Sequence, residues 1–116
     1  MNIQIFGRNK CFDTQKAQRF FKERRIKVQN IDLPRYGMSA GEFKSVKQAV
    51  DGLEKLINYD APGGITVKYL AYDEDKERAL LEDPGLFKTP IVRFGKLATI
   101  GYAPEIWQEW IKEGTP

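Results

Sequence analysis

Cys11 is the residue of this chain whose side chain is best suited to nucleophilic chemistry. It is the single cysteine among 116 residues that include no histidine. A cysteine reacts as its thiolate, which nearby cations and the free N–H groups of a helix N-terminus stabilise. Arg8, Lys10 and Lys16 lie close to it in the sequence, and an apolar-periodic segment begins directly after it. Two interpretations are open: a reactive thiol at the start of a helix, or a small buried residue at a strand–helix junction.

A single cysteine without histidine excludes several kinds of site. No intramolecular disulfide, Cys/His zinc cluster or histidine-based catalytic triad can form. The acidic run Asp73-Glu74-Asp75 is interpreted as the solvated first turn of a helix. Gly63-Gly64 is interpreted as a turn, because a phosphate-binding loop also needs a preceding strand and a lysine. We therefore expect no metal site and no bound cofactor.

The composition is typical of a soluble globular chain, and we expect one domain over residues 1–116. Charged residues make up 30% of the sequence and apolar residues 41%. The net charge of +3 is small and the basic residues are interspersed with acidic ones, so direct nucleic-acid binding is not expected. No apolar run approaches the roughly 18 residues of a membrane span, and the N-terminus lacks a signal-peptide pattern. We expect a cytoplasmic protein that does not bind membranes.

Hydrophobic periodicity predicts the elements that would position Cys11. It predicts a strand over residues 1–6, a helix over 12–24 and a second strand over 26–33, ended by Pro34. A strand–helix–strand order favours a parallel pair of strands. The apolar face of the helix is expected to hold Phe12, Ala17, Phe20 and Phe21.

The middle of the chain is predicted to be helical. Residues 39–42 form a capping-box pattern, Asp51 begins a second helical pattern, and residues 73–86 predict a helix closed by Pro84-Gly85. The segment 65–72 fits either a strand or a helix.

The end of the chain predicts a hairpin followed by a helix. Residues 90–94 and 97–101 are strand-like and are joined by the two-residue turn Gly95-Lys96. Residues 103–114 have an amphipathic helical pattern. Its apolar face is expected to hold Ile106, Trp107, Trp110 and Ile111.

Two segments resemble the ArsC/Spx family of thioredoxin-fold proteins. They are CFDTQKAQRFFKERRIKVQNIDL, which begins at Cys11, and EDPGLFKTPIVRFGKLATIGYAPEIWQEW, which ends at Trp110. The resemblance implies an α/β, thioredoxin-like four-stranded mixed sheet with flanking helices. It also implies a helical insertion of roughly residues 38–86 between strands 2 and 3. Pro90 would be a cis proline that faces Cys11 at the first strand–helix junction.

The sequence departs from the family pattern where arsenate reductases carry three arginines. Those positions hold Asn58, Thr89 and Tyr102, and Gln15 replaces the basic residue usual four positions after the cysteine. A planar, permanently charged, bidentate clamp is hard to replace. Arsenate reduction is therefore expected to be negligible unless Arg93 supplies a substitute guanidinium.

The resemblance implies a one-cysteine thiol oxidoreductase. A branch of the family keeps a single cysteine with a CDT step, and CFDTQKA resembles that branch with Phe12 inserted. The expected partner is a thiol or disulfide substrate. Cys11 would attack a disulfide or oxidised substrate, and an external thiol such as glutathione would resolve the mixed disulfide. The residues expected to stabilise the thiolate or an anion are Lys16, Arg8, Thr14 and Arg93, and those expected to line the substrate groove are Thr89 and Pro90.

The alternative is a non-enzymatic regulatory module. Spx-like proteins bind RNA polymerase, and the helical insertion would be the binding element here. Spx regulators also carry a Cys-x-x-Cys redox switch. Thr14 occupies the second position of that motif, so this switch cannot form.

Overall fold

A four-stranded mixed sheet forms the centre of the computed structural model, which describes residues 1–114. The strand order is β2-β1-β3-β4, with β1 parallel to β2 and antiparallel to β3, and β3 antiparallel to β4. The predicted thioredoxin-like architecture is confirmed. The strands are β1 (Ile3–Gly7), β2 (Val28–Asp32), β3 (Ile91–Phe94) and β4 (Leu97–Ile100).

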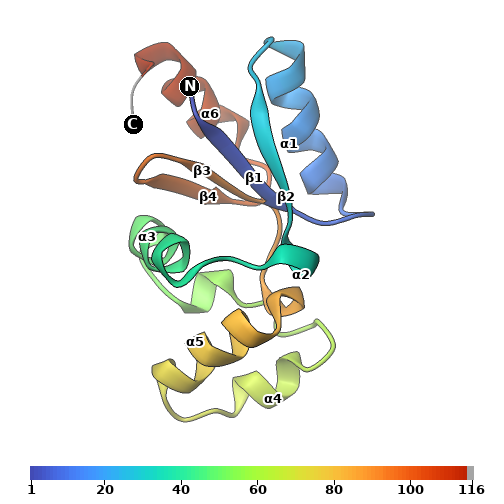
Figure 1. Cartoon of the computed structure of the whole chain (residues 1–116), viewed down its shortest axis with the longest axis vertical. Helices are drawn as coiled ribbons and strands as arrows, with labels where there is room; N and C mark the ends of the chain where they lie inside the picture. Colours follow the sequence, from blue (N-terminus) through green and yellow to red (C-terminus); the bar gives the residue numbers. More distant parts are fainter. Residues whose placement is uncertain (115–116) are drawn as a thin grey trace.

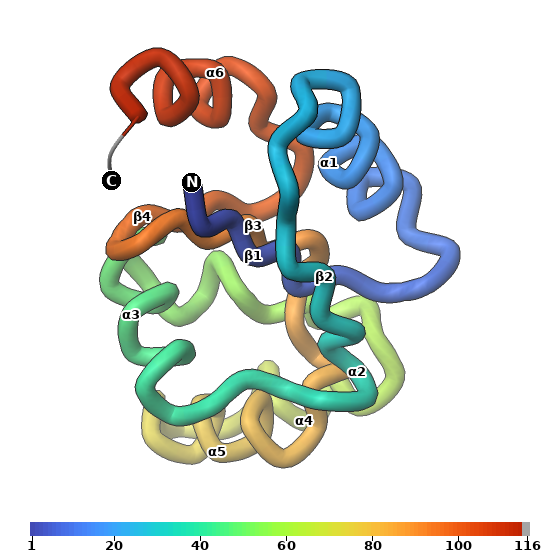
Figure 2. Tube along the Cα trace, turned by 45° about the horizontal axis from the view of Figure 1, so that its top comes forward, coloured from blue at the N-terminus to red at the C-terminus, as the bar shows by residue number. Residues whose placement is uncertain are grey.

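Helices α1 (Phe12–Glu23) and α6 (Pro104–Glu113) lie on one side of the sheet, and the segment between β2 and β3 lies on the other (Figures 1 and 2). Each side has its own apolar core. The α1/α6 side buries Ile3, Ile5, Ala17, Phe20, Phe21, Val92, Phe94, Trp107 and Trp110. Alternation along β1 sends Phe6 to the opposite side, where it packs with residues of the insertion.

The segment between β2 and β3 is helical, as predicted. It contains α2 (Leu33–Tyr36), α3 (Ala40–Val50), η1 (Glu54–Leu56), α4 (Gly64–Lys68), α5 (Asp73–Glu82) and η2 (Pro84–Leu86). The predicted capping box is confirmed, since the Ser39 hydroxyl accepts from the Glu42 N–H and the Glu42 carboxylate accepts from the Ser39 N–H. The ambiguous segment 65–72 contributes a short helix and no strand.

Four predictions of local structure need correction. The strand predicted over 26–33 ends at Asp32, because Leu33 and Pro34 begin the helical turn α2, and proline is compatible with a first helical turn. The helix predicted from Asp51 is only the short η1, since Asp51 itself adopts a left-handed conformation (φ 59°) that ends α3. Phe12 and Ile106 lie outside the core, with exposed fractions of 78% and 49%.

Trp107 joins α6 to the sheet. Its ring is fully buried and packs at 5.2 Å and 5.3 Å, between ring centroids, from Phe20 and Phe21 of α1. Its indole N–H donates to the Thr99 hydroxyl of β4 at 2.8 Å. This one side chain therefore holds α1, α6 and β4 together.

The helices of the described chain are short. Within residues 1–114, no helix combines the length and apolar character needed to cross a membrane.

Candidate functional site

Cys11 lies where the chain passes from β1 into α1. β1 ends at Gly7, the loop 8–10 follows, and Cys11 is the N-cap residue of α1 with extended backbone angles (φ −95°, ψ 113°). Its side chain is half-buried. The predicted position at the end of the first strand is confirmed, and the interpretation of Cys11 as a fully buried core residue is wrong.

Thr89 supplies the opposite wall of the thiol site. The Thr89–Pro90 peptide bond is cis, as the resemblance implied. The Thr89 hydroxyl donates to the Cys11 sulfur at 3.3 Å, and the thiol in turn donates to the Thr89 carbonyl oxygen at 3.7 Å. The antiparallel register of β1 and β3, which pairs Phe6 with Ile91, brings these residues together across 78 positions of sequence.

Thr14 lies beneath the thiol in the first turn of α1. Its side chain is 4% exposed, and its hydroxyl oxygen is buried without a hydrogen-bond partner in the described chain. Helix and strand approach each other closely here, because a Cβ built on Gly7 would lie 2.3 Å from the Thr14 methyl carbon. Only glycine at position 7 lets α1 begin so near the end of β1, which places the hydroxyl beside the sulfur.

Hydrogen bonding lowers the pKa of the Cys11 thiol. Partial burial raises that pKa, but the Thr14 hydroxyl, the Thr89 hydroxyl and the backbone N–H groups of Thr14 and Asp13 together lower it by more. The sulfur does not cap the helix by a hydrogen bond in its thiol form. The Thr14 hydroxyl and the first-turn N–H groups are thus donors that a thiolate would engage, and the site favours the nucleophilic form of Cys11.

The cations expected to stabilise the thiolate are not among the groups that lower the Cys11 pKa. The Lys16 ammonium lies over the Tyr102 ring, 5.4 Å from its centroid. Arg93 points to another part of the molecule, where it donates to Gln4 at 2.7 Å. Neither of these side chains nor that of Arg8 is among the groups that shift the Cys11 pKa. Hydroxyl and backbone donors therefore account for the lowered pKa of Cys11.

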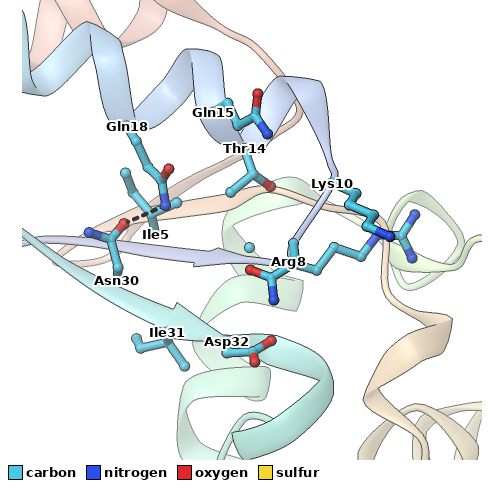
Figure 3. A pocket seen from close by; sticks show the side chains of 11 residues that line it. Ile5, Arg8, Lys10, Thr14, Gln15, Gln18, Asn30, Ile31 and Asp32 are labelled. Carbon is cyan, nitrogen blue, oxygen red and sulfur yellow. Dashed lines mark hydrogen bonds between the residues drawn. The ribbon is translucent and has the colours of Figure 1, made fainter.

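A polar crevice of about 310 Å³ opens beside Thr14, between the β1–α1 loop, α1 and β2 (Figure 3). Across it, the Gln18 amide donates to the Asn30 side-chain oxygen at 3.1 Å. In Figure 3 the Arg8 and Lys10 side chains extend away from this amide pair, at the other end of the crevice. The crevice therefore contains the Gln18–Asn30 amide pair, the Arg8 and Lys10 cations and the Asp32 carboxylate, and it reaches the Thr14 side chain.

Comparison with solved structures identifies the fold. An arsenate reductase from Vibrio cholerae superimposes with a TM-score of 0.81 at 21% identity, covering 94% of this chain and 97% of that one. A Bacteroides fragilis protein described as ArsC family related gives 0.80 at 20%, covering 94% and 97%. A Staphylococcus aureus protein gives 0.73 at 23%, covering 92% and 96%. This chain has the fold of these proteins.

At these identities the similarity establishes the architecture alone. No protein-family model matches the sequence, and neither does any curated protein. The chemistry must therefore be argued from the residues that this chain places around Cys11.

The three residues at the positions where the resemblance implies arginine make other contacts. Asn58 completes a local turn, with its side-chain oxygen accepting from the Asp60 N–H at 3.1 Å. Tyr102 packs on Trp107 and beneath the Lys16 ammonium. Thr89 is the one that contacts the sulfur, as a neutral hydroxyl donor.

Sequence reasoning missed one feature of the site, the direct contact of the Thr89 hydroxyl with the sulfur. The sequence placed Thr89 in a substrate groove, because the residue before a cis proline presents its backbone there. Its hydroxyl is the additional donor. A hydroxyl residue next to a proline predicted to face a cysteine is the signal that would have indicated it.

Proposed function

We propose that this chain is a one-cysteine thiol oxidoreductase of the ArsC/Spx-like family, with Cys11 as its nucleophile. The observation that carries the proposal is a half-buried thiol that accepts a hydrogen bond from the Thr89 hydroxyl and lies beside donor groups of Thr14 and Asp13, which together lower its pKa. The fold shared with an arsenate reductase and an ArsC family related protein supports it. A structural cysteine has no need for donors that favour its thiolate.

The reaction consists of two thiol–disulfide exchanges. The Cys11 thiolate attacks one sulfur of a disulfide substrate, which forms a mixed disulfide on Cys11 and releases the other sulfur as a thiolate that takes a proton from water. An external thiolate then attacks the substrate sulfur of the mixed disulfide, which releases Cys11 as a thiolate and leaves the substrate joined to the external thiol. A second external thiolate attacks the external thiol's sulfur in that disulfide, which frees the substrate thiol and leaves the disulfide of the external thiol. Thr89 and Pro90 form the wall of the groove in which the substrate sulfur would lie.

We propose glutathione as the class of external thiol, a small peptide with amide, carboxylate and amine groups. The crevice beside Thr14 offers side-chain amides from Gln15, Gln18 and Asn30, cations from Arg8 and Lys10, and the Asp32 carboxylate, which could accept from an amine. These groups complement the amides and carboxylates of such a thiol. No second cysteine exists to resolve the mixed disulfide within the chain.

The pH dependence of alkylation tests the activated thiol. Because the pKa of Cys11 is lowered, a larger fraction is thiolate at neutral pH, and iodoacetamide should react faster than with a free cysteine. The rate should rise with a midpoint below about 8.5, the ordinary value. Thr14→Val and Thr89→Val each remove a donor to a charged sulfur, worth roughly 1.5–3 kcal/mol, so each should slow alkylation at pH 7 about tenfold.

Thr66→Val is the matched control, since Thr66 is exposed on α4, far along the chain from the thiol site. It should leave the alkylation profile unchanged. A wild-type midpoint at or above the free-cysteine value would remove the basis of the proposed oxidoreductase. The Spx-like module that binds RNA polymerase would then be the prediction to pursue.

Arsenate turnover should be negligible in a glutathione- and glutaredoxin-coupled assay. The positions of the three family arginines hold Asn58, Thr89 and Tyr102, which carry no charge, and the remaining candidate, Arg93, is bonded to Gln4 away from the sulfur. Without an arginine at any of these three positions, the oxyanion lacks the bidentate partners that the family pattern provides. Saturable arsenate reduction that depends on Cys11 would contradict this prediction.

A further inference from the structure

A second pocket lies at the opposite end of β1 from Cys11. Its volume is about 550 Å³, and it opens over the beginning of β1 and β2 and the end of β3. The polar side chains that line it are Asn2, Gln4, Lys27, Gln29 and Arg93. Nothing in the thiol chemistry uses these residues, so the pocket raises a separate question of what it binds.

Arg93 is the central charge of this pocket. It is partly buried on β3, and its Nη1 donates to the Gln4 side-chain oxygen at 2.7 Å. Within residues 1–114, Arg93 forms no ion pair with a carboxylate. Its Nε is buried and has no partner in this part of the chain. A partly buried guanidinium is costly unless an anion pairs with it, and the protein itself supplies only a neutral amide.

The bond from Arg93 fixes the direction of the neighbouring amides. A guanidinium can only donate, so the Gln4 side-chain oxygen must face Arg93 and the Gln4 NH₂ group must face away. That NH₂ group donates to the Gln29 side-chain oxygen at 3.0 Å. Gln29 is exposed and is the last residue in this series of hydrogen bonds. Its NH₂ group has no acceptor among the described residues.

The pocket therefore presents an excess of hydrogen-bond donors. The free donors are the Gln29 NH₂ group, the Lys27 ammonium and the remaining terminal N–H groups of the Arg93 guanidinium, and no acidic residue lines the pocket. A site rich in donors and positive charge is complementary to a group rich in acceptor oxygens and negative charge. Chloride or water would satisfy such donors less completely than an oxyanion with two or three oxygens.

We propose that this pocket binds the oxyanion group of a small molecule, a carboxylate or a phosphate. Its volume lies within the roughly 300–1,000 Å³ of small-molecule sites. Arg93 and Lys27 neutralise the anion, and Gln29, held by Gln4, donates to one of its oxygens. Ile3 and Val28 also line the pocket, but the Ile3 side chain is buried in the α1/α6 core and Val28 packs against that core, so the polar side chains carry the recognition.

A nitrogen-15 NMR titration of the full chain with inorganic phosphate, and separately with succinate, tests this proposal at constant ionic strength kept by sodium chloride. At least one probe should saturate in the millimolar range and shift the side-chain amide signals of Gln4 and Gln29. The tighter of the two identifies the ligand as a phosphate or a carboxylate. Because a hydrogen bond to a charged group is worth about 1.5–3 kcal/mol, Arg93→Gln should weaken binding about tenfold or more.

Lys27→Gln should also weaken binding, and it tests the pocket if Arg93→Gln fails to fold. Lys44→Gln, which removes the same charge from an exposed position on α3, should leave the affinity within about twofold. Cys11→Ser should bind the probe as the wild type does. The proposal is overturned if neither probe gives saturable shifts at Gln4 and Gln29, or if Lys44→Gln and Arg93→Gln weaken binding equally.

Discussion

Cys11→Ser should reduce the proposed disulfide reductase activity to the uncatalysed background, a loss on the order of 10³-fold or more. The reason is the nucleophile itself, because a serine hydroxyl stays protonated where the Cys11 thiol is held toward its thiolate by Thr14 and Thr89. The measurement is reduction of cystine by glutathione, followed through NADPH consumption by glutathione reductase.

We expect this loss of activity to occur without unfolding of the variant. Serine is close to cysteine in size and is a favoured N-cap residue of α1, so the variant should unfold at a temperature near that of the wild type. Thr14→Val and Thr89→Val should retain activity at high pH, where the thiol ionises without their help, and lose it toward neutral pH. Undiminished activity of Cys11→Ser would show that the turnover does not pass through this site.

Trp107→Ala should destabilise the fold by about 3–5 kcal/mol, the usual cost of removing a large buried aromatic side chain. The indole is fully buried against α1, and its N–H donates to the buried Thr99 hydroxyl. Alanine would leave a cavity between α1, α6 and β4 and an unsatisfied hydroxyl. Since domains of this size are stable by roughly 5–15 kcal/mol, much of the stability would be lost. Urea denaturation followed by circular dichroism measures this change.

Two further variants separate the contribution of the Trp107–Thr99 hydrogen bond from that of the apolar packing of Trp107. Trp107→Phe keeps most of the apolar contact but leaves Thr99 without its donor, so it should cost about 1–3 kcal/mol. Ile106→Ala, at the neighbouring half-exposed position, should cost less than about 1 kcal/mol. Equal destabilisation by Trp107→Ala and Ile106→Ala would contradict the role of Trp107 as the link between α6 and the sheet.

The sequence by itself determined the elements that flank Cys11. The helical spacing of Ala17, Phe20 and Phe21 requires a helix that packs on a sheet, and all three are buried as predicted. The helix begins at Phe12, so Cys11 has its backbone at the N-cap, beside free N–H groups. The capping box at Ser39 was likewise a local pattern that the structure confirms. Local rules sufficed because the interacting residues are within a few positions of one another.

Only the tertiary structure decided which side chains act on the sulfur. Charge and sequence position predicted that Lys16 and Arg93 would stabilise the thiolate. In the folded chain, however, these long side chains contact other groups: Lys16 lies over the Tyr102 ring and Arg93 donates to Gln4. The Thr89 hydroxyl reaches Cys11 because β1 and β3 pair antiparallel in one register.

The same register that brings Thr89 to the thiol carries Arg93 away from it. Each residue along a strand advances by about 3.3 Å, so the four residues from Thr89 to Arg93 move the guanidinium to the other end of β1, opposite Gln4. Strand register is a property of the whole sheet, set by the packing of both its faces. Periodicity in one strand could therefore predict that Arg93 lies on a strand, but not which end of the molecule its charge would occupy.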